Sequence, residues 1–229
     1  DDLVTGVQTC ALPISTTPAY AQSWLLTQIV SQDYVDLKND GPSDDDFGYW
    51  TKFKYSKAHS NYRWRSPYQG ANYEKGYFSN EKDDKAAFNY GEKEIYYLRS
   101  VETKTHIAVF ELGERLDGLG AHARDAQDGE VGEQSLKYLR NIKLYSKADL
   151  TQPISTVHFQ YDYSLCPGIP NNAGGAVPSS EDAWITGNTG GKLTLKKVWT
   201  TGLDNEKGGN HPYQFAYANP TADYRPQQV

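Results

Sequence analysis

The residues of this chain best suited to chemistry form an acidic stretch at residues 36–46, Asp-Leu-Lys-Asn-Asp-Gly-Pro-Ser-Asp-Asp-Asp. Asp36, Asp40 and Asp44 fall at positions one, five and nine of a calcium-binding loop, with a glycine after the second carboxylate for the bend. Lys38 occupies position three, where a ligand oxygen is expected and a cation opposes metal binding. The stretch therefore predicts either an acidic surface turn or a structural calcium site, and no other cofactor.

A second group of side chains suits carbohydrate binding. Residues 50–77 are rich in aromatic side chains, whose flat faces can stack on the C–H surface of a sugar ring. Packing in a core or along an edge strand explains the same residues equally well. The candidate stacking residues are Trp50, Tyr62, Trp64, Tyr68 and Tyr73.

Signatures of catalysis are absent from the sequence. It contains no G-x-S-x-G, Walker A or H-E-x-x-H motif, and Cys166 has no readable His or Asn partner. Glu92, Glu94 and Glu111 could pair as the two carboxylates of a glycosidase, but glutamates that alternate along a strand usually form a solvated face. The sequence therefore predicts no enzymatic activity.

The composition limits the partners. The chain has 29 acidic and 23 basic residues, a net charge of −6, and no basic block. Nucleic-acid binding depends on clustered Lys and Arg, so that class of partner is not expected. Apolar runs such as Trp24-Leu25-Leu26 are far shorter than the roughly 20 residues that span a bilayer, so no transmembrane segment is expected.

The elements that position these residues follow a recurring pattern. Four times a Leu is followed three residues later by Ile or Val and then, after a turn-rich gap, by Phe-x-Tyr or Phe-x-Leu. A recurring unit of this size cannot bury its apolar face alone and must pack against its neighbours. The four copies are Leu26-Thr-Gln-Ile29 with Phe53-Lys-Tyr55, Leu98-Arg-Ser-Val101 with Phe110-Glu-Leu112, Leu139-Arg-Asn-Ile142 with Phe159-Gln-Tyr161, and Leu195-Lys-Lys-Val198 with Phe215-Ala-Tyr217.

The pattern predicts an all-β fold, with one extended antiparallel sheet built from about four two-stranded units and long polar loops. The chain has 18 Tyr, 5 Trp and no Met, a composition that favours strands. Leu98 and Val101 lie an odd number of residues apart, so a regular strand would direct them to opposite faces. Either both faces of that strand are covered, or a β-bulge separates the two residues.

The second strand of the third unit alternates strictly between apolar and polar residues. Val157, Phe159, Tyr161 and Tyr163 share one face. The other face carries Thr156, His158, Gln160 and Asp162. The alternation predicts a strand whose polar face is exposed to solvent.

The domain organisation separates three segments. Residues 4–14, Val-Thr-Gly-Val-Gln-Thr-Cys-Ala-Leu-Pro-Ile, resemble the translation of a common sequencing adapter, so residues 1–14 are interpreted as an artefactual segment. Residues 15–218 are predicted to form a single β-rich repeat domain, a fragment of a larger protein. Residues 219–229 have no core-forming pattern and are predicted to be an unstructured, truncated tail.

Several of the strand motifs are familiar as a group. Tyr97-Leu-Arg-Ser-Val-Glu-Thr-Lys-Thr-His-Ile-Ala-Val-Phe110, Val157-His-Phe-Gln-Tyr-Asp-Tyr163, Leu193-Thr-Leu-Lys-Lys-Val198 and the charged turn Arg115-Leu-Asp117 resemble RHS/YD-repeat-like regions of large envelope or secreted proteins of Gram-negative bacteria. The resemblance covers roughly residues 20–217. The Tyr-Asp dipeptide that names the YD repeat occurs once in this setting, at residues 161–162, and the loop at residues 167–191 is longer than the group usually has.

The resemblance implies a non-catalytic structural scaffold or shell, located in the cell envelope or outside the cell. The implied partner is the remainder of the same polypeptide. The alternative function is a carbohydrate-binding module that uses the aromatic segment at residues 50–77 to bind a glycan or surface component.

Overall fold

The structure, a computed structural model, describes residues 16–68, 77, 86–122, 131–172, 185–188, 190–202 and 211–218. Residues 1–14 and 219–229, interpreted above as an artefact and a tail, lie outside them. The described residues contain no helix, and so none that is long and apolar enough to cross a membrane. They form nine strands: β1 (Gln28–Val30), β2 (Trp50–Ser66), β3 (Asn89–Glu102), β4 (His106–Ala121), β5 (Val131–Ser146), β6 (Ser155–Leu165), β7 (Ile185–Asn188), β8 (Lys192–Gly202) and β9 (Tyr213–Gln214).

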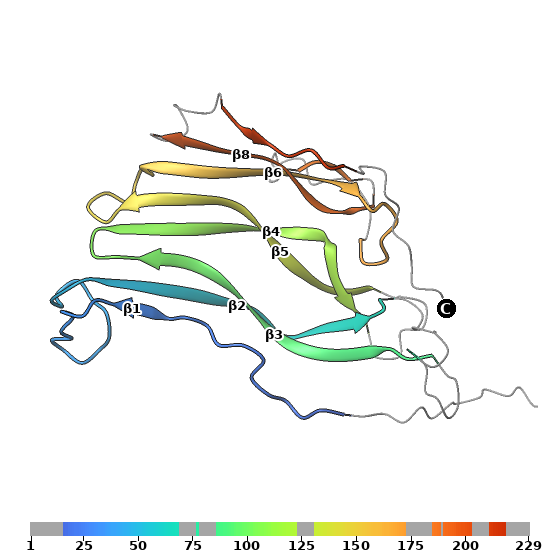
Figure 1. Ribbon diagram of the computed structural model, residues 1–229, viewed down its shortest axis with the longest axis horizontal. Coiled ribbons are helices and arrows are strands. Elements are labelled where there is room, and N and C mark those ends of the chain that lie inside the picture. Colours follow the sequence, from blue (N-terminus) through green and yellow to red (C-terminus); the bar gives the residue numbers. More distant parts are fainter. Residues whose placement is uncertain are drawn as a thin grey trace, which may run out of the picture.

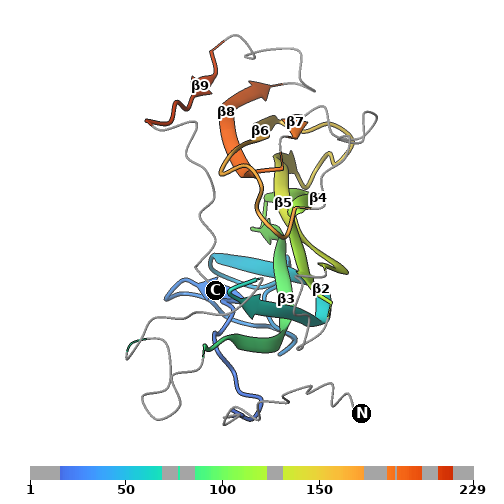
Figure 2. The ribbon, with the colours of Figure 1, turned by 90° about the vertical axis from the view of Figure 1, so that its right-hand side faces the viewer.

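The strands form one open sheet in the order β1-β2-β3-β4-β5-β6-β8-β9, with β1 and β9 at its two edges (Figure 1). All of these neighbours are antiparallel, and the short β7 pairs in parallel with β6. The sheet is strongly twisted, as strands of L-residues are (Figure 2). The predicted all-β fold, an extended antiparallel sheet of repeated two-stranded units, is confirmed.

The four units share one pairing register. Within a unit, the Ile or Val of the first strand lies opposite the residue two before the Phe of the second strand. The pairs are Ile29 with Thr51, Val101 with Ala108, Ile142 with Val157, and Val198 with Tyr213. Between units, the Phe lies opposite the Ile or Val of the next unit, in the pairs Phe53 with Val101, Phe110 with Ile142, and Phe159 with Val198. The sequence repeat is therefore also a repeat of strand pairing.

A β-bulge explains the odd spacing of the Leu and the Ile or Val. Tyr55 and Phe53, which are two residues apart on β2, lie opposite Leu98 and Val101, so the register slips at Arg99. Because of this extra residue, Leu98 and Val101 share a face of the sheet. The same slip occurs at Arg140 in β5 and at Lys196 in β8. Of the two explanations left open by the sequence, the bulge is therefore observed in three units.

In three of the units a tyrosine hydroxyl bonds to the segment that carries the Leu of the motif. The Tyr of Phe-x-Tyr donates to the carbonyl oxygen of the Leu in the same unit. The bonds are Tyr55 to Leu26 (2.9 Å), Tyr161 to Leu139 (2.8 Å) and Tyr217 to Leu195 (2.7 Å). The second unit has Leu112 at this position and lacks the hydroxyl. Because the same bond recurs in three units, the Tyr of the motif has a structural role.

The two ends of the sheet differ in strand pairing. At the turn end, which carries the turns at residues 31–49, 103–105 and 147–154, the strands within each unit pair over a few residues. The long pairings β2–β3, β4–β5 and β6–β8 join different units and continue to the opposite end. There the three two-stranded ribbons β2–β3, β4–β5 and β6–β8 diverge from one another, and side chains of different ribbons come into contact. We call this end the splayed end. The core of Tyr138, Tyr163 and Ile185 is formed there.

The polar face of β6 is not exposed as predicted. Thr156 and His158 are buried, with 1% and 4% of their surface exposed. His158 stacks on Trp199 of β8 with ring centroids 5.0 Å apart, and its Nε2 lies 2.8 Å from the Thr201 hydroxyl. The prediction of a solvated face was wrong because side chains of the neighbouring strand β8, Trp199 and Thr201, contact His158 on this face.

Candidate functional site

The acidic turn does not gather its three predicted calcium ligands. Both carboxylate oxygens of Asp36 accept main-chain N–H groups, from Lys38, Asp40 and Gly41 at 2.8–3.2 Å. Asp44 instead points to Lys147, at 2.7 Å from its Nζ. No cluster of three or more acidic, His or Cys side chains suited to a metal occurs in the described part of the chain. Asp36 and Asp44 are therefore held by protein donors in this turn, and a calcium site at Asp36, Asp40 and Asp44 stays a prediction.

The buried centre of this turn is Asp46, which was not among the predicted ligands. Its carboxylate accepts the N–H of Leu37 (3.1 Å) and of Ser43 (2.9 Å) and the hydroxyl of Tyr34 (2.9 Å). Burial works to raise the pKa of Asp46, but these hydrogen bonds outweigh it and the pKa is lowered. A short periodic pattern could not identify Asp46, because its partners come from both sides of the loop.

The candidate sugar-stacking residues do not form one exposed platform. Trp50 and Tyr62 are buried, with 4% and 5% of their surface exposed, and so have no free ring face to offer a sugar. Trp50 donates its Nε1–H to Ser43 O, and Tyr62 donates to Gly118 O at 3.0 Å. Tyr68 donates to Gly120 O, and Trp64 is the most exposed of the four described residues. Tyr73 lies outside the described residues. The exposed-platform interpretation was therefore wrong for Trp50 and Tyr62.

The candidate glycosidase carboxylates are members of cross-strand ion pairs. Glu94 lies 2.7 Å from Lys57, and Glu111 lies 2.7 Å from Lys143. Glu92 lies 3.4 Å from Arg63. Each glutamate thus faces a cation of the adjacent strand, an arrangement typical of sheet stabilisation.

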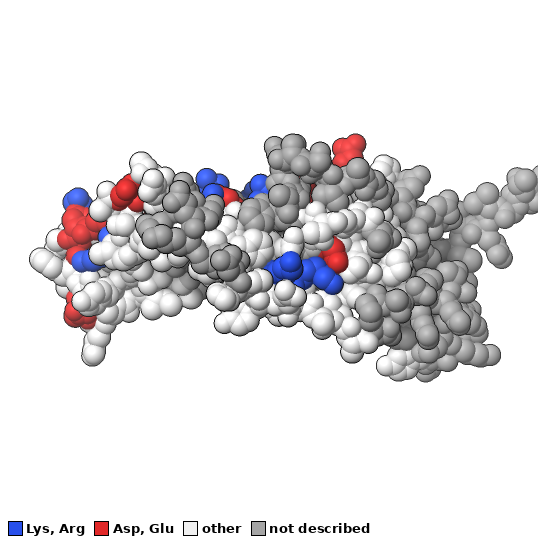
Figure 3. Space-filling view, turned by 90° about the horizontal axis from the view of Figure 1, so that it is seen from above, with Lys and Arg blue, Asp and Glu red and all other residues white. Residues whose placement is uncertain are grey.

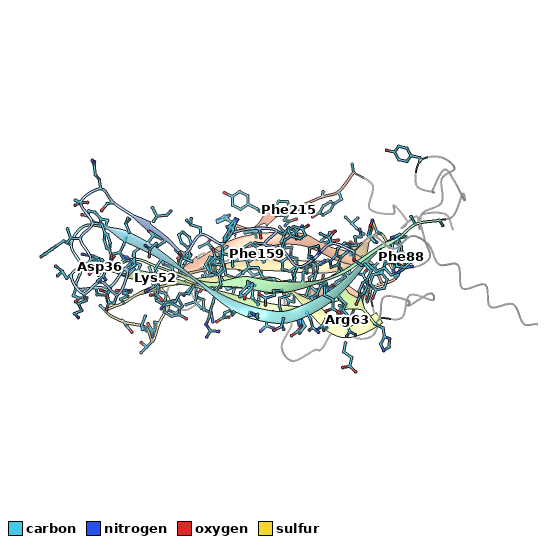
Figure 4. All side chains as sticks on the ribbon, turned by 90° about the horizontal axis from the view of Figure 1, so that it is seen from below. Asp36, Lys52, Arg63, Phe88, Phe159 and Phe215 are labelled. Atoms are coloured by element: carbon cyan, nitrogen blue, oxygen red, sulfur yellow. The ribbon has the colours of Figure 1, made fainter. Side chains whose placement is uncertain are left out.

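The most elaborate polar arrangement lies at the splayed end, where the three ribbons surround a cavity of about 320 Å³. Its charged lining comprises Arg65 from β2, Arg115 and Asp117 from β4, and Lys192 from β8. This site is far from the acidic turn: Arg63 and Phe88 mark the splayed end, and Asp36 and Lys52 the turn end (Figure 4).

Asp117 ties two ribbons together beside this cavity. Its side chain is 1% exposed and accepts Arg115 Nε and Nη2 at 2.9 and 2.7 Å in a bidentate pair. It also accepts the N–H of Leu193, on β8, at 2.9 Å. The hydrogen bond to Asp117 raises the pKa of Arg115. A wide register slip in β4, between Glu114 and Leu119, turns this segment out of the ladder and toward β8.

The second arginine of the cavity is also held by the protein. Arg65 donates Nη1–H to the carbonyls of Pro67 (2.8 Å) and Tyr68 (3.3 Å), and its guanidinium lies 4.2 Å from the centre of the Phe88 ring. With three cations and one carboxylate in the lining, the cavity would favour an anion over a cation. Both arginines, however, donate hydrogen bonds to protein acceptors, so the main role of the site is to hold the ribbons together.

Charge on the face seen in Figure 3 is distributed unevenly. Basic side chains gather near the middle of that face, with an acidic group beside them, and acidic side chains gather at the turn end. The visible face does not carry the continuous basic patch that is typical of a nucleic-acid interface.

Comparison with known proteins yields no relative. No protein-family model matches this chain, no curated protein matches it, and no solved structure matches it.

Proposed function

We propose that this chain is a structural segment whose function is to extend a β-sheet by repeated two-stranded units, without catalysis of its own. The observation that carries the proposal is the shared register at the three junctions between units, where Phe53, Phe110 and Phe159 each lie opposite the Ile or Val of the next unit. A register that recurs at every junction allows units to be added without changing the fold.

The energetics of the junctions support this proposal. The longest strand pairings lie between units, not within them, so each unit depends on its neighbour for most of its hydrogen bonds. Two-stranded hairpins are marginal in water, and they gain stability when further strands are added. A sheet of this design suits a scaffold or shell, and a single unit would not be stable by itself.

The resemblance to RHS/YD-repeat-like regions supplies the wider setting of the proposal. On that resemblance, the chain belongs to a large envelope-associated or secreted protein of a Gram-negative bacterium, and its principal partner is the rest of its own polypeptide. The carbohydrate-binding alternative has less support, because the rings of Trp50 and Tyr62 are buried.

An added unit provides the direct test. A copy of residues 131–165, which contains the third unit, is fused after residue 218, and the urea midpoint of unfolding is compared with that of the parent chain. We expect a higher midpoint and a larger m-value, because the added strands pair with the exposed β9 edge and bury its apolar side chains.

The matched control carries Lys at the positions that copy Leu139 and Ile142, the residues that would face β9. This fusion has the same length but cannot pack its first strand, and it should unfold like the parent chain. Equal midpoints for the fusion and the control would contradict the proposed function.

A further inference from the structure

The two edges of the sheet are the two unmatched halves of the junction that recurs inside it. β1 carries the Leu-x-x-Ile strand of the first unit and has no strand on its outer side among the described residues. β9 and the residues after it carry the Phe-x-Tyr strand of the last unit, which is likewise paired on one side among the described residues. Figure 1 shows these edges on opposite sides of the molecule. Each edge therefore lacks a neighbouring strand of the kind that the other edge provides.

The side chains that would meet at such a junction are exposed. Leu26 and Ile29 are 53% and 54% exposed, and Phe215 and Tyr217 are 43% and 37% exposed. Their counterparts at the internal junctions, such as Phe110 and Ile142, are half-buried against each other. Neither edge segment, residues 26–30 or 213–217, contains the Lys or Pro that commonly protects an edge strand.

The backbone of the last strand is oriented for pairing. The N–H of Phe215 donates inward to Lys196 O on β8 at 3.0 Å. Because successive residues of a strand point their N–H and C=O groups to alternate sides, those of Gln214 and Ala216 point to the free edge. Phe53 has the same relation to β1, with its N–H 2.8 Å from Thr27 O, and Phe53 pairs on its other side with Val101.

From this correspondence we infer that a second copy of this chain docks head to tail, with the β9 edge of one copy against the β1 edge of the next. The internal register places Phe215 opposite Ile29 and Tyr217 opposite Leu26, with a bulge at Thr27. Such an interface is heterologous, so each copy keeps one free edge of each kind and association can continue. The inference rests on the proposed function, because it uses the register that carries that proposal.

Cysteine cross-linking tests the predicted register. Cys10 and Cys166 are first replaced by Ser, and two single variants, Phe215→Cys and Ile29→Cys, are then mixed and oxidised. Phe215 and Ile29 would form a non-hydrogen-bonded pair with Cα atoms about 4.5 Å apart, within the range that a disulfide spans. We expect a cross-linked dimer in the mixture that is several times more abundant than either variant forms alone. The control replaces Ile29→Cys with Val30→Cys, one residue out of register, and should give much less product.

Sedimentation of the full chain over a series of concentrations gives an independent measurement. The average mass should rise with concentration, and Ala216→Pro should abolish the rise, because proline removes an N–H that points to the free edge. Ala216→Ser is the matched control and should associate normally. A chain that stays monomeric throughout, or a mixture that cross-links no better than the single variants or the out-of-register control, would overturn the inference.

Failure of this inference is distinguishable from failure of the proposed function. If the fused unit stabilises the chain while free copies do not associate, the sheet extends only by covalently linked units. If the fused unit also has no effect, the shared register does not support extension at all.

Discussion

The turn end and the splayed end of the sheet differ in what holds their strands together. At the turn end the same register recurs in every unit, and the Phe and the Ile or Val side chains that define it are only half-buried or, at the two edges, exposed. At the splayed end the fully packed residues, such as Tyr163 and Asp117, belong to single units. Counted from the Phe of the motif, the position of Asp117 is occupied by Ser60 in the first unit and by Cys166 in the third.

This difference separates two tasks. The repeated residues determine which strands pair and in which register, and they do so with modest burial at each site. The unrepeated residues determine how the ribbons pack on one another. Substitutions at the splayed end should therefore affect global stability strongly, and substitutions in the repeat should have smaller effects that recur from unit to unit.

The largest effect is expected for Asp117→Asn. The substitution removes the charge of a buried carboxylate that accepts Arg115 and Leu193, and breaking one partner of a buried ion pair costs about 3–5 kcal/mol. Urea unfolding followed by tyrosine and tryptophan fluorescence measures the loss. Glu114→Gln, which alters the exposed pair with Lys137, is the control and should cost less than about 1 kcal/mol. Equal losses in the two variants would show that the buried Asp117 carboxylate contributes no more to stability than an exposed one.

High pH should destabilise the splayed end through two of its tyrosines. Burial raises the pKa of both Tyr62 and Tyr68 to about 12, from an ordinary value of 10.0. The folded state therefore keeps protons that the unfolded state loses. The stability from this effect is complete below pH 10 and is lost as the pH rises from 10 to 12, by about 1–3 kcal/mol for each tyrosine.

Urea midpoints measured below and within this pH range test the expectation. Tyr62→Phe and Tyr68→Phe should each flatten the alkaline decline, since phenylalanine has no proton to lose. Tyr49→Phe is a suitable control, because Tyr49 is 76% exposed and should leave the decline unchanged. A decline that is the same in all variants would show that other groups control alkaline unfolding.

The sequence predicts the turn end of the sheet better than the splayed end. The repeat residues carry a local signal, so the strand units follow from spacing alone, and the odd separation of Leu98 and Val101 already posed the bulge as an explanation. The role of Asp117 depends on Leu193, 76 residues away, and on how the ribbons separate, which no local period encodes. For the same reason Arg115-Leu-Asp117 was interpreted only as a charged turn, and His158 as a solvated residue.

A smaller effect is expected from the tyrosines of the repeat. Tyr161→Phe removes the hydroxyl that donates to Leu139 O, and the loss of one such hydrogen bond costs about 1 kcal/mol. Tyr217→Phe removes the corresponding bond at the exposed β9 edge and should cost less. The converse variant, Leu112→Tyr, adds the missing hydroxyl to the second unit and should not destabilise the chain if the unit geometry is truly shared. A strongly destabilised Leu112→Tyr variant in urea unfolding would contradict that equivalence.

The smallest effect is expected from calcium at the turn end. Asp36 already accepts three main-chain N–H groups, Asp44 faces Lys147, and Lys38 pairs with Asp45 at 2.6 Å, holding the pKa of Asp45 down to about 2. These donors compete with a cation for the carboxylate oxygens of Asp36, Asp44 and Asp45. The thermal midpoint should therefore be the same with EDTA and with added calcium. A midpoint that rises with calcium in the parent chain but not in Asp36→Asn would show that the turn rearranges around a metal, and that the turn end has a ligand-dependent element the splayed end lacks.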